Sequence, residues 1–233
     1  MAHTVLLRAS ADTSHDVAPL RRLHAPACYQ YRVASAPVGG FTKRAFDFAV
    51  AGSALLVLSP LLLIVALVVR MASPGPALFR QKRTGFRGRA FTILKYRTMT
   101  TMEDGRMLTQ ARPDDARVTT LGRFLRRTSI DELPQLINVV RGDMSLVGPR
   151  PHAVMHDRDF LDVDSEYPRR FLARPGITGA AQVAGARGVT DTPEKVQLRL
   201  RHDLDYVDGW RLRRDIAILL STVALLFGDR NAC

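Results

Sequence analysis

Two adjacent carboxylates, Asp131 and Glu132, are the residues of this sequence with the clearest capacity for chemistry. Pro134 follows them, and because proline is favourable only in the first turn of a helix, we expect the pair at or just before a helix N-terminus. Gly142 is positioned as the stop of that helix. The positive end of a helix keeps a carboxylate ionised and stabilises a phosphate. The pattern therefore indicates phosphoryl chemistry, with one carboxylate as nucleophile or metal ligand.

Several basic residues could hold phosphate groups in such a reaction. Arg126, Arg127 and Arg150 lie near the acidic pair in sequence and could form a charge clamp. Lys95 and Arg97 could also bind phosphate, or they could be solvent-facing residues of a strand.

The acidic pair also has a purely structural interpretation. Ser129-x-x-Glu132 matches a capping box, in which the two side chains bond the free N–H groups at a helix start. Acidic first turns are common, so spacing alone favours this role over catalysis. Asp203 and Asp205, which have basic neighbours, are expected to be surface ion-pair partners.

The sequence lacks the motifs typical of nucleotide-binding, metal-binding and redox sites. The sequence contains neither a GxxxxGK[ST] loop nor a GxGxxG motif, so P-loop or Rossmann nucleotide binding is unsupported. None of the six histidines belongs to a set with metal-ligand spacing. Cys28 and Cys233 match no metal or redox spacing, which makes a reduced, cytoplasmic environment the default.

The charge of the chain is uneven. The 233 residues suffice to bury a core, and 34 Lys and Arg against 22 Asp and Glu give a net charge of +12. Residues 70–151 hold 16 of the basic residues and only 7 of the acidic ones. An anionic partner is therefore expected: nucleic acid, acidic lipid or a phosphorylated substrate.

The excess of positive charge directly follows a long apolar segment. Residues 48–69 carry no charge and are long enough, as a helix, to cross a bilayer. Ser59-Pro60 interrupts the segment, since proline removes a helical hydrogen bond. Both flanks are basic, which favours a re-entrant helix that dips into one leaflet and returns. A kinked spanning helix stays open as the alternative.

The remaining pattern predicts an α+β fold that is mostly helical, with a small β-hairpin over residues 77–82 and 90–96. Helices are expected at 121–127, 193–210 and 215–227, the last as a core or interfacial helix. Three regions follow: a mobile leader (1–40), a re-entrant membrane helix broken at Ser59-Pro60 (41–75), and a cytosolic catalytic domain with interfacial helices (76–233).

The order and spacing of several short motifs resemble those of the bacterial sugar transferase family, whose members are monotopic polyprenyl-phosphate phosphoglycosyl transferases. The resemblance covers about residues 43–227. The matching pieces include Lys43-Arg44-x-Phe46-Asp47, Ser59-Pro60, Ser73-Pro74-Gly75-Pro76, Lys95-x-Arg97, Ser129-x-Asp131-Glu132-Leu133-Pro134-Gln135, Gly148-Pro149-Arg150-Pro151, Arg174-Pro175-Gly176-Ile177-Thr178-Gly179 and Asp203-x-x-Tyr206.

The resemblance implies a two-step reaction at the cytoplasmic face of the inner membrane. Asp131 would attack the β-phosphate of a UDP-sugar and release UMP, and polyprenyl phosphate would then accept the phosphosugar. Glu132 would assist as Mg2+ ligand or base, and Asp131 is a second candidate ligand. The candidate phosphate- or nucleotide-binding residues are Lys95, Arg97, Arg126, Arg150 and Arg174. Membrane lipids are further partners, a homodimer stays open, and nucleic acid is not among the implied partners.

One departure concerns Ala180, which stands where many members of the family have tryptophan. Residues 185–188 resemble members that act on glucose or galactose. Two alternatives from other classes remain: a membrane-tethered nucleic-acid-binding protein, suggested by basic residues interleaved with aromatic ones, and a non-catalytic assembly protein.

Overall fold

The computed structural model describes residues 37–100, 115–186, 188, 190 and 192–228. Residues 1–36 of the predicted leader lie outside this part. The described elements are α1 (Gly40–Ala72), β1 (Leu78–Thr84), η1 (Phe86–Gly88), β2 (Ala90–Tyr96), α2 (Thr120–Arg127), η2 (Ile130–Glu132), α3 (Gln135–Arg141), β3 (Ser145–Val147), α4 (Val154–Val163), η3 (Tyr167–Leu172), β4 (Gly176–Thr178), α5 (Ala180–Val183), α6 (Pro193–Asp208) and α7 (Leu212–Gly228). The predicted α+β class, mostly helical with a small hairpin, is confirmed.

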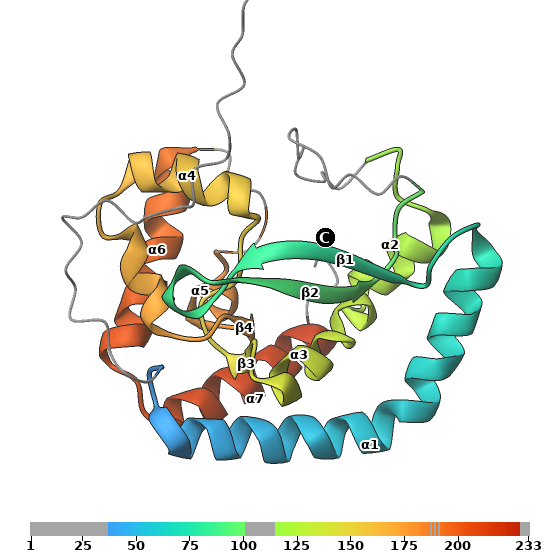
Figure 1. Ribbon diagram of the computed structural model, residues 1–233, viewed down its shortest axis with the longest axis horizontal. Helices are drawn as coiled ribbons and strands as arrows, with labels where there is room; N and C mark the ends of the chain where they lie inside the picture. Colours follow the sequence, from blue (N-terminus) through green and yellow to red (C-terminus); the bar gives the residue numbers. More distant parts are fainter. Residues whose placement is uncertain (1–36, 101–114, 187, 189, 191, 229–233) are drawn as a thin grey trace, which may run out of the picture. The chain divides into compact units, whose positions relative to one another are not determined.

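The hairpin of β1 and β2 lies in front of the helices (Figure 1). Its turn contains Gly88, whose φ of 69° lies in the left-handed region that glycine adopts without strain. The strands pair from Leu78 opposite Tyr96 to Thr84 opposite Ala90. Alternate residues therefore share a face, and Lys95 points to the same side as its direct partner Phe79.

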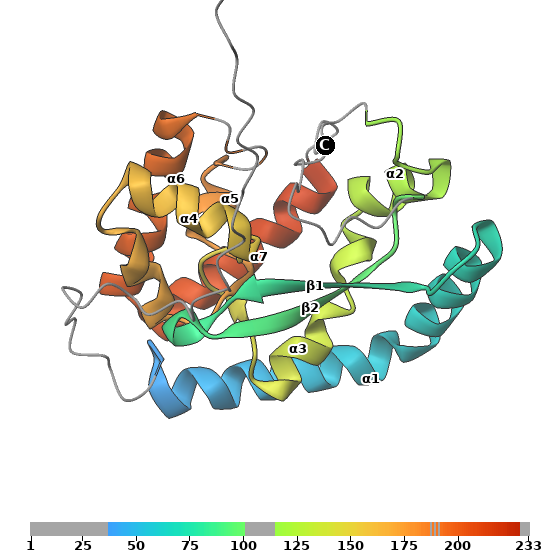
Figure 2. The same ribbon diagram turned by 45° about the horizontal axis from the view of Figure 1, so that its top comes forward.

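Helix α1 bends partway along its length, as both ribbon views show (Figures 1 and 2). Pro60 has no N–H to donate to the carbonyl of Leu56, one turn earlier. The hydroxyl of Ser59 takes over that role and donates to Leu56 O over 2.8 Å. The expected break at Ser59-Pro60 is thus a bend within one continuous helix rather than a gap between two helices.

Most of α1 is uncovered by the rest of the protein. Only 11% of its most apolar 18-residue window is buried, and its composition and length suffice to cross a membrane. A helix of a soluble core would be covered instead. The large apolar side chains that stay exposed along it include Phe41, Leu56, Val57, Leu63 and Met71. The described structure therefore presents a long apolar surface suited to lipid.

The N-terminal end of α1 is fastened to the rest of the protein by polar side chains. Lys43 Nζ donates to Asp215 Oδ2 of α7 over 2.6 Å, and both groups are buried. Ser145 Oγ of β3 donates to Asp47 Oδ2 over 2.7 Å. Arg44 donates to the last carbonyls of α3, at 2.5 Å and 2.6 Å from the oxygens of Val139 and Val140.

A short parallel pair, β3 with β4, connects two of the sequence motifs. Gly148 N donates to Thr178 O over 2.9 Å, and Gly176 N donates to Pro149 O over 3.0 Å. A side chain at Gly176 would collide with the backbone of Gly148, so this close approach requires glycine. The pairing fixes the start of the loop that carries Arg150. Around it, α1, β2, α3, α6 and α7 share one hydrophobic core.

Candidate active site

The acidic pair lies on a tight connection between α2 and α3. Ser129 adopts a left-handed conformation with a φ of 55°, which is uncommon for a residue other than glycine. A single 3-10 turn, η2, then carries Asp131 and Glu132, and Pro134 leads into α3, which ends at Gly142 as predicted. The turn brings the carboxylate of Glu132 within hydrogen-bond distance of Lys95 on β2.

The capping-box interpretation is wrong for this turn. Ser129 makes no side-chain capping hydrogen bond, and Glu132 N donates to the main-chain oxygen of Ser129 over 3.1 Å. The carboxylate of Glu132 is turned away to two cations. Lys95 Nζ donates to its Oε1 over 2.6 Å. Arg150 Nη2 donates to the same oxygen over 2.6 Å, and Nη1 reaches Oε2 at 3.2 Å.

These contacts fix the charge state of Glu132. Burial alone would raise the pKa of its carboxyl group, but the charges of Arg150 and Lys95 and their hydrogen bonds hold that pKa well below its usual value. Glu132 is therefore an ionised anchor that orients Lys95 and Arg150. Its low pKa makes it a weak base for proton transfer.

Asp131 has the opposite environment. Its carboxylate is 7% exposed, and none of the described residues donates a hydrogen bond to it. Burial raises its pKa to about 6, an effect opposed by the charge of Lys95 and reinforced by that of Glu132. A carboxylate that is desolvated, unbonded and more basic than usual suits attack on phosphorus. The two neighbouring acids thus have separate roles.

Arg126, at the end of α2, also acts on Asp131. Its Nε donates to Thr98 Oγ1 over 3.0 Å. Its charge acts on Asp131, as does that of Arg150, and both lower the pKa of that acid. The structure therefore brings together five of the predicted residues: Lys95, Arg126, Asp131, Glu132 and Arg150.

Arg97 lies elsewhere. Its guanidinium is buried at the C-terminal end of α1, where it donates to Ser73 O over 2.6 Å, to Val69 O over 3.3 Å and to Pro74 O. The last carbonyls of a helix have no partner within the helix, so Arg97 supplies the missing donors. The structure thus gives Arg97 a structural role that its place in the motif did not indicate.

Arg174 is also separate from the carboxylates. Its Nε donates to Gly142 O over 2.9 Å, at the C-terminal end of α3, whereas the acidic pair precedes the other end. Partial burial and the charge of Arg44 lower its pKa. Arg174 and Arg44 thus bind the same helix end, and the structure does not bring Arg174 to Asp131.

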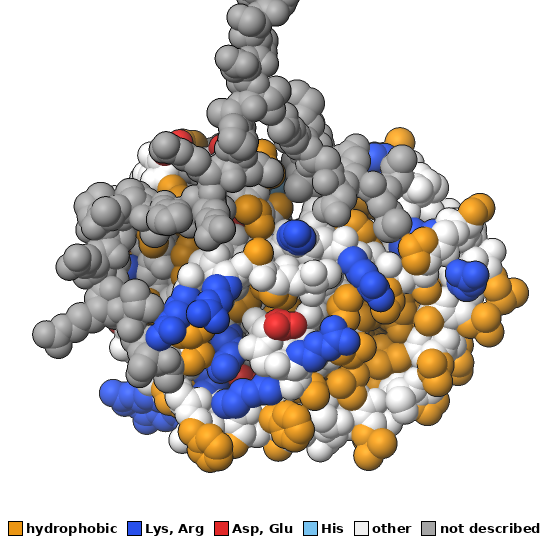
Figure 3. Space-filling model, in the orientation of Figure 1, with side chains coloured by type: hydrophobic (Ala, Val, Ile, Leu, Met, Phe, Trp, Pro, Cys, Tyr) orange, Lys and Arg blue, Asp and Glu red, His pale blue; other side chains and the backbone are white. Residues whose placement is uncertain are grey.

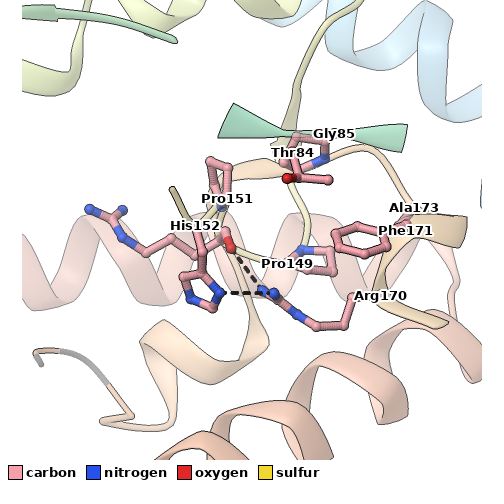
Figure 4. Close-up of a pocket in the computed structure, with 10 residues that line it drawn as sticks. Thr84, Gly85, Pro149, Pro151, His152, Arg170, Phe171 and Ala173 are labelled. Carbon is pink, nitrogen blue, oxygen red and sulfur yellow. Dashed lines mark hydrogen bonds between the residues drawn. The ribbon is translucent and has the colours of Figure 1, made fainter. Parts of the chain in front are cut away.

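A buried polar network behind Arg150 was not expected. Arg170 of η3 donates through Nη2 to the main-chain oxygen of Arg150 over 2.7 Å (Figure 4). It also donates through Nε to Asp203 Oδ2 over 2.9 Å. Its Nη1 donates to Tyr167 Oη over 2.7 Å. Asp203 is 2% exposed, so the predicted surface position of this residue is wrong. A buried arginine needs a buried counter-charge, which α6 provides.

His152 completes this network. Its Nδ1 lies 3.0 Å from Arg170 Nη1, and its Nε2 lies 3.2 Å from Arg199 Nη1. Burial and the charges of Arg170 and Arg199 lower the pKa of His152 well below its usual value, so the ring is neutral and can accept a hydrogen bond at only one of its two nitrogens. No spacing rule could have found the network, because its members come from η3, α6 and the loop after Arg150.

A small cavity beside Arg170 is too small for a substrate. Its lining includes Pro149, Pro151, His152 and Phe171 (Figure 4), and it measures about 10 Å3, roughly the space of one water molecule. The face of the protein on the side of the β1–β2 hairpin differs from this small cavity in its exposed charges. Figure 3 shows Lys and Arg side chains gathered around its centre and hydrophobic side chains on the side of α1. This face therefore carries exposed positive charge that can attract phosphate groups.

The acidic pair fits Mg2+ through one carboxylate. Mg2+ prefers oxygen ligands and is commonly held by one or two carboxylates together with substrate phosphates and water. Both oxygens of Glu132 are engaged by Lys95 and Arg150, whereas the carboxylate of Asp131 is not bonded by any described residue. Asp131 is therefore the better candidate ligand of the two.

Ala180 begins α5 and is half-buried against the core. The residues at 185–188 that suggested the sugar include position 187, which lies outside the described residues.

Comparison with known proteins identifies the family and several relatives of this chain. The model of the family described as "Bacterial sugar transferase" matches residues 38–229. A UDP-glucose:undecaprenyl-phosphate glucose-1-phosphate transferase from Caulobacter vibrioides is 53% identical over 190 residues, which are 82% of this chain and 71% of that protein. The protein of the same description from Escherichia coli is 47% identical, over 84% of this chain but only 42% of its own length. The exopolysaccharide production protein PSS of Rhizobium leguminosarum is 46% identical, over 78% of this chain and 92% of that protein.

Proposed function

The chain belongs to the bacterial sugar transferase family and is an enzyme of the phosphoglycosyl transferase class, and we propose that it transfers glucose 1-phosphate from UDP-glucose to undecaprenyl phosphate. The observation that carries the proposal is the environment of Asp131: a buried carboxylate without a hydrogen-bond donor among the described residues, set among Lys95, Arg126 and Arg150. The glucose donor and the undecaprenyl acceptor come from the names of the relatives.

In the first half-reaction, a carboxylate oxygen of Asp131 bonds to the β-phosphorus of UDP-glucose. The bond from that phosphorus to the bridging oxygen breaks, and UMP leaves with the electron pair. Lys95, Arg126 and Arg150 offset the negative charge of the phosphates, which would otherwise repel the attacking anion. Glu132 holds Lys95 and Arg150 in place.

In the second half-reaction, a phosphate oxygen of undecaprenyl phosphate attacks the phosphorus of the aspartyl phosphosugar. The ester bond breaks, the carboxylate of Asp131 is restored, and the lipid diphosphate sugar leaves. Both attacking groups are already anions, so neither step requires a strong base, in agreement with the low pKa of Glu132.

Mg2+ is part of the proposal. It would be held by the carboxylate of Asp131 together with phosphate oxygens of the donor. Bound there, it would neutralise phosphate charge. Removal of the metal with EDTA should stop UMP release, and added Mg2+ should restore it.

The lipid substrate explains the exposed apolar surface of α1. We infer that α1 is embedded in the inner membrane from the cytoplasmic side and that its bend returns both ends to that side. Basic residues flank the apolar segment on both sides, which supports this orientation.

The decisive test is a trapped intermediate. Purified protein incubated with UDP-glucose and Mg2+, without acceptor, should release about one UMP per active site and gain the mass of one hexose phosphate on the peptide that contains Asp131. The matched control is the Asp131→Asn variant, which should do neither. Release of UMP without any mass gain on that peptide would overturn the covalent mechanism.

A further inference from the structure

A cleft of about 720 Å3 opens between the C-terminal half of α1 and the start of β1. This volume is in the range of sites that hold whole organic ligands, unlike the small cavity beside Arg170. Most of its lining is apolar, and two arginines lie among the apolar residues. The lining consists of Ala66, Arg70, Pro76, Ala77, Leu78, Phe79 and Arg80.

The walls of the cleft are held in place by the contacts of β2 with α1. Tyr96 Oη donates to Leu62 O over 2.6 Å, and the Arg97 guanidinium binds the carbonyls at the end of α1. The guanidinium packs where a side chain at Gly75 would lie, and Gly75 has a φ of +112°. The connection from α1 to β1 is therefore fixed, and the cleft is preformed rather than created by a ligand.

The chemistry of the cleft matches an amphiphilic anion. Arg70 and Arg80 are exposed at its edge, and within the described part of the chain neither forms an ion pair or side-chain hydrogen bond. Cations without a counter-charge beside an apolar channel favour a ligand with a negative head and a hydrocarbon chain. Since α1 carries the lipid-facing surface, such a ligand can enter from the membrane.

The cleft and the active site share the β1–β2 hairpin. Phe79 lines it and is the direct cross-strand partner of Lys95, so the two side chains project from the same face of the hairpin. Lys95 in turn binds Glu132, next to Asp131. A ligand whose chain lies against Phe79 therefore contacts the hairpin face that also carries Lys95.

We propose that this cleft binds the part of the isoprenoid chain nearest the phosphate of the acceptor, with Arg70 and Arg80 attracting that phosphate on its way to Lys95. The inference rests on the proposed function and adds a binding site for its second substrate. The ligand of the cleft is the polyprenyl phosphate rather than a bulk phospholipid.

The test separates the two half-reactions. UMP released without acceptor reports on the donor step alone, and steady-state turnover with undecaprenyl phosphate or farnesyl phosphate, a short isoprenoid phosphate, reports on the acceptor. Ala66→Phe narrows the cleft, and Leu63→Phe on the exposed side of α1 is its matched control. The Arg70→Gln/Arg80→Gln double variant removes the charges, and Arg89→Gln at the hairpin tip is its control.

We expect Ala66→Phe to release UMP in the donor step while its KM for undecaprenyl phosphate rises about tenfold, the effect of losing contact with a few methylene groups. The KM for farnesyl phosphate should change less. The double arginine variant should raise KM for both acceptors, because both carry a phosphate. The two control variants should keep the KM values of the unchanged protein.

An unchanged KM for undecaprenyl phosphate in Ala66→Phe would overturn the proposal. If that variant fails to fold, an unchanged KM in the double arginine variant overturns it equally. Competition by phosphatidylglycerol as strong as by an unreactive isoprenoid phosphonate would also contradict it, because the cleft would then be a general lipid site. Absence of UMP release from the unchanged protein would instead refute the proposed function, so the two failures are distinguishable.

Discussion

The side chain of Arg150 binds Glu132 while the main-chain oxygen of Arg150 accepts a hydrogen bond from Arg170 over 2.7 Å. One residue is thus held from both ends, by an acid in the active site and by a buried arginine behind it. Arg170 is itself fixed by Asp203 and Tyr167. The position of the Arg150 guanidinium consequently depends on a network that touches no reacting atom.

Arg170→Lys tests this dependence. Lysine cannot span Asp203, Tyr167 and Arg150 at once, because its three donors share one nitrogen. We expect kcat/KM of the donor step to fall about tenfold or more and the free energy of unfolding to fall by about 2–4 kcal/mol. Stopped-flow UMP release and urea unfolding measure the two effects. Arg169→Lys, at a partly exposed pair with Glu166 and Asp208, should lower stability by less than about 1 kcal/mol.

Asp131→Asn should abolish activity without loss of stability. Amide nitrogen or oxygen cannot form the phosphosugar ester, so UMP release should fall by about three orders of magnitude or more. Burial disfavours the charged form of Asp131, so a neutral residue of the same shape relieves that cost. The midpoint of thermal unfolding should stay equal or rise. A large decrease in the midpoint would contradict the description of Asp131 as an unpaired buried acid.

Glu132→Gln should have the opposite effect on stability. The neutral side chain leaves Lys95 and Arg150 without their shared counter-charge, and we expect the free energy of unfolding to fall by about 1–3 kcal/mol. Donor-step activity should fall as well, because both cations lose their orientation. Unfolding curves of Glu132→Gln and Asp131→Asn, recorded side by side, compare two adjacent acids that lie in opposite electrostatic environments.

The pH dependence of the donor step should reflect Asp131. Its pKa is raised to about 6, so the acid is protonated below that pH and cannot attack. The rate of UMP release should therefore fall as the pH decreases through about 6, rather than near 4 as for an ordinary aspartate. Glu132, whose pKa is held low, should stay ionised throughout. Single-turnover rates between pH 5 and 8 give the profile, and a flat profile would contradict the assignment.

The bend of α1 predicts the topology of the membrane segment. With both ends on the cytoplasmic side, cysteines placed at Phe41 and Lys82, in a protein with Cys28 and Cys233 replaced by serine, should react only with a reagent that reaches the cytoplasm. Pro60→Leu restores the donor to Leu56 O and should favour a straight, spanning helix. Labelling of one end from outside in the unchanged protein would favour the spanning alternative.

Local signals in the sequence predicted the elements well. Gly88 lies in the hairpin turn, and Gly142 ends α3 with a φ of 91°, because both positions need a conformation that glycine adopts freely. The hairpin and α2 lie within two residues of their predicted bounds, and α7 extends the last predicted helix by three residues at its start. These features depend only on nearby residues.

The partners of the site depend on residues far apart in sequence and could not be predicted in the same way. Glu132 fits a capping box locally, yet its partners Lys95 and Arg150 come from β2 and from the loop after β3. Asp203 has basic neighbours in sequence, yet it binds Arg170, 33 residues earlier. The residues next to an acid in sequence indicate only what surrounds it on its own helix. The tertiary fold determines which basic residue forms an ion pair with it.

Arg44 joins the beginning of α1 to the end of α3, and α3 begins directly after the acidic pair. A change in the tilt of α1 should therefore shift α3 through Arg44, and with α3 the adjacent Asp131. With α1 embedded in the membrane as proposed, we expect the thickness of the bilayer to affect the position of Asp131. Reconstitution in thin and thick membranes should then alter turnover even though every side chain of the protein is unchanged.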